Sequence, residues 1–177
     1  LSALAAEVAL AERQTSLAVA AAALLLAGLA TYAFVLSSFD FHQLLTGHGD
    51  HWIAGGALAI ATLACARAAG AVDLSPSLAG LGHVLDDASF GLWVAAAIWL
   101  PVLVVGELVS PRLAYDFRRW SAVFPLGMYA VCSLAVGTAT GIGWLGDFGR
   151  DWIWVAFAAW AVVLPATLVR AVALART

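Results

Sequence analysis

The chain has 177 residues, of which 64% are hydrophobic and 11% are charged, and its formal net charge is −3. Soluble domains are close to half apolar and a quarter charged, so this composition disfavours a soluble enzyme, a disordered tail and a nucleic-acid-binding protein. Cys65 and Cys132 both lie inside apolar runs, unlike the cysteines of a disulfide framework or a thiolate metal site. The expected solvent for most of the chain is a lipid bilayer.

Five apolar stretches are long enough to cross a membrane, because a helical span needs about 20 mostly apolar residues. Backbone polar groups have no partner in lipid, so each stretch is expected to be helical and not part of an alternating β-barrel. Residues 1–16 are expected as an extramembrane or amphipathic lead-in, and residues 17–177 as an all-α transmembrane domain. The expected spans cover residues 17–37, 52–72, 88–109, 120–142 and 152–169.

The second and fourth spans differ in composition from the other three. The second opens with WIAGGA, which contains Gly55 and Gly56, and the fourth carries Ser133, Gly137 and Gly141 at four-residue spacing, with Gly127 earlier in the span. Small residues at this spacing let helix backbones approach closely in lipid. The other spans are bulkier, with leucine, valine and tryptophan. We therefore expect the second and fourth spans to be inner helices that line a path, with packing alone as the alternative role of any single glycine.

Phe124 and Pro125 stand next to each other inside the fourth span. Proline removes a backbone donor and can kink a helix, and a kink at Pro125 could direct the phenyl ring of Phe124 toward a central path. The alternative is an ordinary packed phenylalanine beside an ordinary membrane proline. The central parts of both inner spans are uncharged, and a neutral path binds an ion weakly enough to release it.

Few polar side chains are candidates for chemistry. Arg67 would attract anions if it faced a vestibule, whereas the alternative is a side chain that reaches the membrane interface. His48 and His51 flank Asp50, but no inner span supplies further metal ligands, so a solvated loop with a helix-starting aspartate is favoured. Because the histidines lie in links or near span ends, a haem site is disfavoured, and no metal, other cofactor or covalent chemistry is expected.

The arginines near the span ends predict an orientation for a multi-pass protein of the cell membrane. The first and third links and the C-terminus share one side of the membrane and carry more arginines than the other side. This bias places the C-terminus in the cytoplasm and residue 1 outside. The first side holds Arg112, Arg118, Arg119, Arg170 and Arg176, and the second holds Arg13, Arg67 and Arg150.

Two blocks of sequence resemble a known family. Residues 115–129 (YDFRRWSAVFPLGMY) are similar to the penultimate span of the tellurite-resistance/dicarboxylate transporter family, which includes the plant slow anion channels. Residues 49–58 (GDHWIAGGAL) resemble the start of an earlier inner span in bacterial members. The resemblance implies ten spans in five hairpins, a homotrimer, and inner helices around a pore that a phenylalanine of the penultimate span plugs. Phe124 occupies that position here, although a neighbour one turn away is the alternative.

The five spans would match only the C-terminal half of such a protein. The resemblance therefore implies that an N-terminal half is missing or that a second chain supplies it, and the leucine at position 1 also favours a missing upstream segment. The expected cargo is a small anion: a C4-dicarboxylate, sulfite, tellurite, nitrate or chloride. The alternative function is a small structural or accessory subunit of a larger membrane complex, which adjacent respiratory-complex genes would favour over an adjacent five-span segment.

Overall fold

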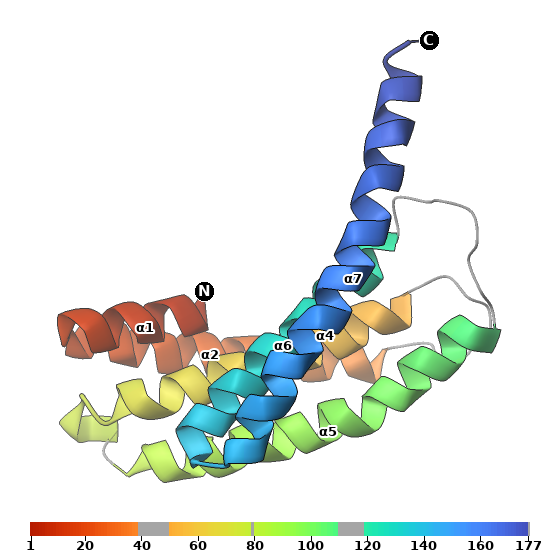
Figure 1. The fold of residues 1–177 in the computed structure, drawn as a ribbon. Helices are drawn as coiled ribbons and strands as arrows, with labels where there is room; N and C mark the ends of the chain where they lie inside the picture. Colours follow the sequence, from red (N-terminus) through yellow and green to blue (C-terminus); the bar gives the residue numbers. More distant parts are fainter. Residues whose placement is uncertain (39–49, 79, 110–118, 177) are drawn as a thin grey trace.

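The computed structural model describes residues 1–38, 50–78, 80–109 and 119–176, and all elements in these ranges are helices. This confirms the all-α fold class and the five helices long and apolar enough to cross a membrane. The helices pack as a bundle from which the C-terminal part of the last helix projects (Figure 1). Their bounds are α1 Ser2–Glu12, α2 Thr15–Ser37, α4 Asp50–Val72, η1 Pro76–Leu78, α5 Leu81–Val109, α6 Trp120–Thr140 and α7 Gly143–Leu174.

The first two helices form an antiparallel hairpin. The chain reverses at Arg13, which adopts a left-handed conformation (φ 50°), and its backbone N–H donates to the carbonyl of Ala9. The hydroxyl of Ser2 donates to the carbonyl of Ala21 over 2.7 Å, joining the two helices. Alanines of α1 and α2 are buried against each other and against Ala71 of α4. The lead-in expected over residues 1–16 therefore contains a helix that packs on the bundle.

The last two helices form a second hairpin, in which glycines allow a close approach of the two backbones. Gly141 ends α6 in the left-handed region (φ 71°), which glycine adopts without steric cost. A Cβ on Gly137 would lie 2.8 Å from the backbone nitrogen of Gly146, and one on Gly149 would lie 2.9 Å from the carbonyl oxygen of Ala130. The backbones of α6 and α7 thus touch where these glycines meet.

Burial separates inner from outer helices. Within the most apolar window of each helix, 50% of the residues are buried in both α4 and α6, against 11% in α2 and α5 and 0% in α7. The small residues of α4 and α6 allow neighbours on several sides, whereas the bulkier helices present apolar side chains outward. The prediction that the second and fourth spans are the inner ones is confirmed.

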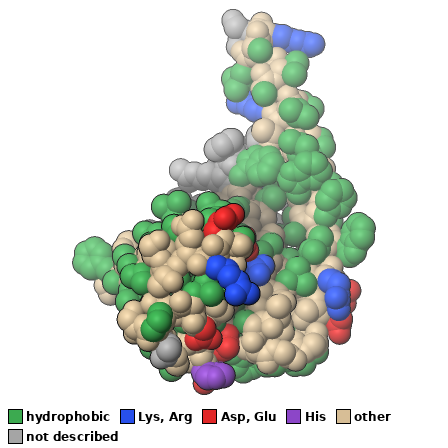
Figure 2. All heavy atoms as spheres, turned by 90° about the vertical axis from the view of Figure 1, so that its left-hand side faces the viewer, with side chains coloured by type: hydrophobic (Ala, Val, Ile, Leu, Met, Phe, Trp, Pro, Cys, Tyr) green, Lys and Arg blue, Asp and Glu red, His purple; other side chains and the backbone are tan. Residues whose placement is uncertain are grey.

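The helices alternate in direction, so their ends gather on two sides of the bundle. The α1–α2 turn, the α4–α5 link and the α6–α7 turn lie at one end, at the left of Figure 1. Acidic, basic and histidine side chains are visible on that end in Figure 2. The opposite end holds the start of α4, the end of α5 and the start of α6.

Candidate functional site

One face of α6 is open. Phe124 is 57% exposed, Val131 is 41% exposed, and Thr138 is also exposed. These three residues are seven positions apart, which places them on one side of a helix two turns from each other. Gly127 lies on the same side, and a Cβ built there would meet nothing within 4 Å. We call this face, made by Phe124, Gly127, Val131 and Thr138, the open stripe of α6.

Pro125, next to the open stripe, points the other way. It is fully buried, and a Cβ on Gly56 of α4 would lie 2.9 Å from its Cγ. A Cβ on Gly55 would lie 2.8 Å from Leu103 and 3.4 Å from the hydroxyl of Tyr129. The structure therefore brings Gly56 and Pro125 together at the crossing of the two inner helices, and turns Gly55 toward α5 and α6.

Ser133 is part of a buried hydrogen-bond network between α5 and α6. Its hydroxyl accepts a hydrogen bond from Nε1 of Trp93 and donates to the carbonyl of Tyr129, both over 2.7 Å. The hydroxyl of Tyr129 donates to the carbonyl of Ala96 over 2.9 Å. Because buried polar groups are costly when unpaired, this network fixes α6 against α5.

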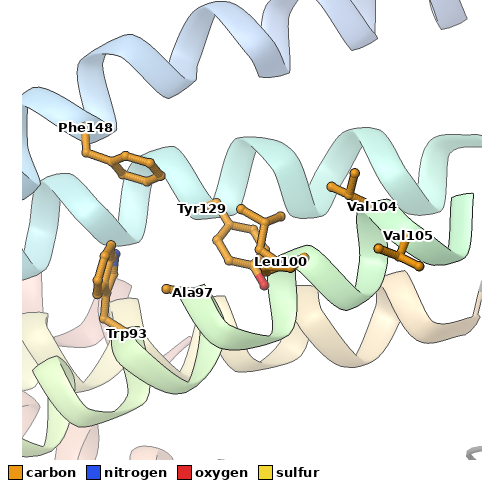
Figure 3. Close-up of a pocket in the computed structure, with 8 residues that line it drawn as sticks. Trp93, Ala97, Leu100, Val104, Val105, Tyr129 and Phe148 are labelled. Atoms are coloured by element: carbon orange, nitrogen blue, oxygen red, sulfur yellow. The ribbon is translucent and has the colours of Figure 1, made fainter. Parts of the chain in front are cut away.

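An apolar cavity of about 380 Å³ lies between α5, α6 and α7 (Figure 3). The ring centroids of Trp93 and Phe148 are 5.9 Å apart in an edge-to-face arrangement at one side of this cavity. A second apolar cavity of about 620 Å³ lies between α1, α2 and α4, with Thr31, Tyr32 and Ile60 among its lining residues. Phe124 is not among the residues that line either cavity. It lies on the open stripe instead.

Arg67 lies on α4 and is partly exposed. Its Nε is 3.2 Å from Oε1 of Glu7 in α1, so the charge of the guanidinium is compensated across the two helices. Ile60 and Ile53, seven and fourteen residues before Arg67, are exposed on the same side of α4. The pairing of Arg67 weakens its attraction for anions compared with an unpaired arginine.

The first turn of α6, which leads to Phe124, is attached to both outer neighbours. Nη1 of Arg119 donates to Oε1 of Glu107 in α5 over 2.7 Å. Nε1 of Trp120 donates to the hydroxyl of Thr167 in α7 over 3.0 Å. An ion pair thus joins the end of α5 to the start of α6.

The structure divides the predicted pore residues into two groups. Phe124 and Gly127 share the open stripe, whereas the remaining predicted residues of α4 and α6 pack between helices. These packed residues are Gly55, Gly56, Pro125, Ser133 and Gly137. Sequence reasoning missed Val131 and Thr138, although their seven-residue spacing from Phe124 was a signal for a shared face. The side chains of His48 and His51 lie outside the described residues.

The fold and this site define a polytopic helical membrane protein whose inner helix α6 leaves one uncharged face open. The sequence model of the voltage-dependent anion channel family (SLAC1) matches residues 1–168. The chain therefore belongs to the voltage-dependent anion channel family, which confirms the resemblance seen in the two sequence blocks.

Two curated relatives are uncharacterized membrane proteins of Mycobacterium tuberculosis, from strain H37Rv and strain CDC 1551 / Oshkosh. Each is 34% identical to this chain over 127 residues, which cover 67% of this chain and 62% of the relative. The chain thus matches less than two thirds of the length of these relatives. No solved structure matches the chain.

Proposed function

We propose that this protein carries small anions across the membrane along a neutral path that Phe124 closes. The observation that supports this proposal is the exposure of Phe124, at 57%, on an inner helix whose most apolar window is half buried. A phenyl ring there, one residue before the buried Pro125, can block or clear the space in front of α6 by a change of rotamer. Membership of the voltage-dependent anion channel family supports an anion as the transported species.

The proposed path is uncharged along α6. The open stripe contains a phenyl ring, a glycine, a valine and a threonine hydroxyl, so an anion meets no fixed cation on it. Weak binding of this kind favours release and therefore flux. The proposed cargo includes a C4-dicarboxylate, sulfite, tellurite, nitrate or chloride.

The path needs a second wall, because the open stripe has no helix in front of it among the described residues. We propose that the missing wall comes from an N-terminal half or from a partner chain, and that the complete protein is a homotrimer. The two glycine contacts away from the stripe, at Gly56 and Gly149, keep α6 close to α4 and α7, so the open stripe is the face available for that wall.

The proposed orientation places residue 1 outside and the C-terminus in the cytoplasm. The sequence assigns five arginines, Arg119, Arg170 and Arg176 among them, to the side of the C-terminus against three on the other side, and positive residues favour the cytoplasmic side. A reporter fused after residue 177 that is active only in the cytoplasm should be active, and a reporter that requires export should be silent. The reverse pattern would contradict the orientation.

The flux test uses the intact protein in liposomes and compares a panel of anions. Phe124→Ala should raise anion flux about twofold to tenfold, because displacing a side chain from its rotamer costs about 0.5–1.5 kcal/mol and the variant avoids that cost. Phe157→Ala is a matched control, since Phe157 is 54% exposed but lies on the outer helix α7. Its flux should equal that of the wild type.

Two outcomes would contradict the proposal. Equal flux in the Phe124→Ala and wild-type proteins, with unchanged assembly, would remove the gate. An intact protein that moves none of the anions would remove the transport function and favour the alternative, a structural subunit of a larger membrane complex.

A further inference from the structure

We infer that the Glu107–Arg119 ion pair and the Trp120–Thr167 hydrogen bond are two tethers that position the turn of α6 bearing Phe124. The inference rests on the proposed function only for the meaning of Phe124 as a gate. The tethers join this turn to α5 on one side and to α7 on the other. Glu107, Arg119, Trp120 and Thr167 are therefore positioning residues and do not themselves line the proposed path.

The turn that carries Phe124 lies between the start of α6 and a proline. Helix α6 begins at Trp120, and the residue before it, Arg119, makes no side-chain capping hydrogen bond. Pro125 has no N–H, so it cannot donate the helical hydrogen bond expected at its position. The helix therefore lacks one backbone hydrogen bond at the buried Pro125.

The ion pair is the stronger of the two tethers. The Nη1–Oε1 distance is 2.7 Å, and the side chains of Arg119 and Glu107 are only 24% and 25% exposed. A charge-assisted hydrogen bond that is partly shielded from water is stronger than an exposed pair. It connects the last residues of α5 to the residue that precedes α6.

The second tether has a fixed acceptor. The hydroxyl of Thr167 donates to the carbonyl of Val163 in its own helix over 2.9 Å. This bond orients the hydroxyl so that a lone pair accepts from Nε1 of Trp120. Because Trp120 lies one helical turn before Phe124, the contact with α7 restrains the same turn that carries the phenyl ring.

Pro125 is the point at which α6 is held against α4. It is fully buried, and its ring packs where a Cβ on Gly56 would lie 2.9 Å away, so the helix cannot shift toward α4 at this point. The turn before the proline is thus bounded by α4 behind it, α5 through Glu107, and α7 through Thr167. A displacement of either outer helix is passed directly to Phe124.

The test measures the accessibility of position 124 in the intact protein reconstituted into liposomes. The parent variant carries Phe124→Cys together with Cys65→Ala and Cys132→Ala, which remove the two buried native thiols. A membrane-impermeant maleimide reports the labelling rate of the new thiol. The rate is compared after adding Glu107→Gln or the nearly isosteric Thr167→Val to this parent.

Either added substitution should raise the labelling rate of the thiol at position 124 about fivefold. Loss of one such side-chain contact shifts the equilibrium between the shielded and the accessible state of this position by roughly the same factor. Exchanging the charges, with Glu107→Arg and Arg119→Glu together, should return the rate toward that of the parent. Asp147→Asn is the matched control, since it breaks the exposed Asp147–Arg150 ion pair of α7 and should leave the rate unchanged.

The outcomes separate this inference from the proposed function. Labelling rates that are unchanged by both Glu107→Gln and Thr167→Val would overturn the tethers, whatever the flux. Rates that rise with either variant and return after charge exchange would support the tethers, even if the wild-type protein moved no anion. A rise that also appears with Asp147→Asn would indicate general loosening of the bundle and would overturn the inference.

Discussion

The close contact between α6 and α7 at Gly149 predicts that replacing this glycine by alanine destabilises the protein. A Cβ on Gly149 would lie 2.9 Å from the carbonyl oxygen of Ala130 and 3.0 Å from the backbone nitrogen of Leu134. Both atoms belong to the backbone of α6, so no side-chain rotation can make room. In Gly149→Ala the two helices must therefore move apart, and such overpacking typically costs about 1–3 kcal/mol.

Alanine also stabilises a helix relative to glycine by about 0.5–1 kcal/mol, and this gain has to be separated from the clash. Gly91→Ala supplies the comparison, because Gly91 lies inside α5 and a Cβ there meets nothing within 4 Å. Both variants gain the same helix propensity, whereas only Gly149→Ala separates two backbones. The difference in unfolding free energy between them should thus equal the overpacking cost, about 1–3 kcal/mol.

The assay is reversible unfolding of the intact protein in mixed detergent micelles, followed by tryptophan fluorescence and by far-UV circular dichroism. A thermal melt should show the same order, since 1 kcal/mol corresponds to about 2–4 °C for a chain of 150–250 residues. If Gly149→Ala proved as stable as Gly91→Ala, the inferred backbone contact between α6 and α7 would be wrong.

Two further variants test the packing of the inner helices. Ser133→Ala removes the acceptor of Nε1 of Trp93 and should destabilise the protein by about 1–3 kcal/mol, while Thr138→Ala, an exposed hydroxyl with the same local bond, should cost far less. Equal unfolding free energies for these two variants would contradict a stabilising role of the buried network. Gly56→Ala places a methyl group against the proline of α6 and should be less stable than Gly91→Ala by about 1–3 kcal/mol in the same unfolding assay; a more stable Gly56→Ala protein would show that α4 and α6 are further apart.

The two tethers and the proposed anion flux together predict that the outer helices α5 and α7 position the gate, in addition to shielding the inner helices from lipid. The start of α6 is attached to α5 through Glu107 and to α7 through Thr167, and the proposed gate follows one turn later. Substitutions at these outer positions are expected to alter the accessibility of position 124 without touching the open stripe. Phe157→Ala, also on α7 but away from the tether, separates this effect from a general response to changes in the outer helix.

The number of spans and the division into inner and outer helices could be predicted from the sequence. Long, mostly apolar runs must be helical in lipid, because the backbone has no other partner there, and this holds regardless of how the helices pack. Clusters of small residues in the second and fourth spans marked them as inner, since only small side chains allow neighbours on several sides. The resemblance of residues 115–129 to a known family could also be seen in the sequence, because it depends on one continuous stretch of residues and not on the fold.

The role of each small residue was decided by the tertiary structure. Gly56, Gly127 and Gly137 look alike in the sequence, yet Gly56 packs on Pro125, Gly137 on the backbone of α7, and Gly127 faces open space. Spacing shows that a close approach is possible but not which neighbour makes it.

The same holds for the charges. Arg67 finds Glu7 sixty residues away, and Arg119 finds Glu107 across the link between α5 and α6. Periodicity along a single helix carries no information about a partner on another helix, because that depends on how the helices are placed side by side.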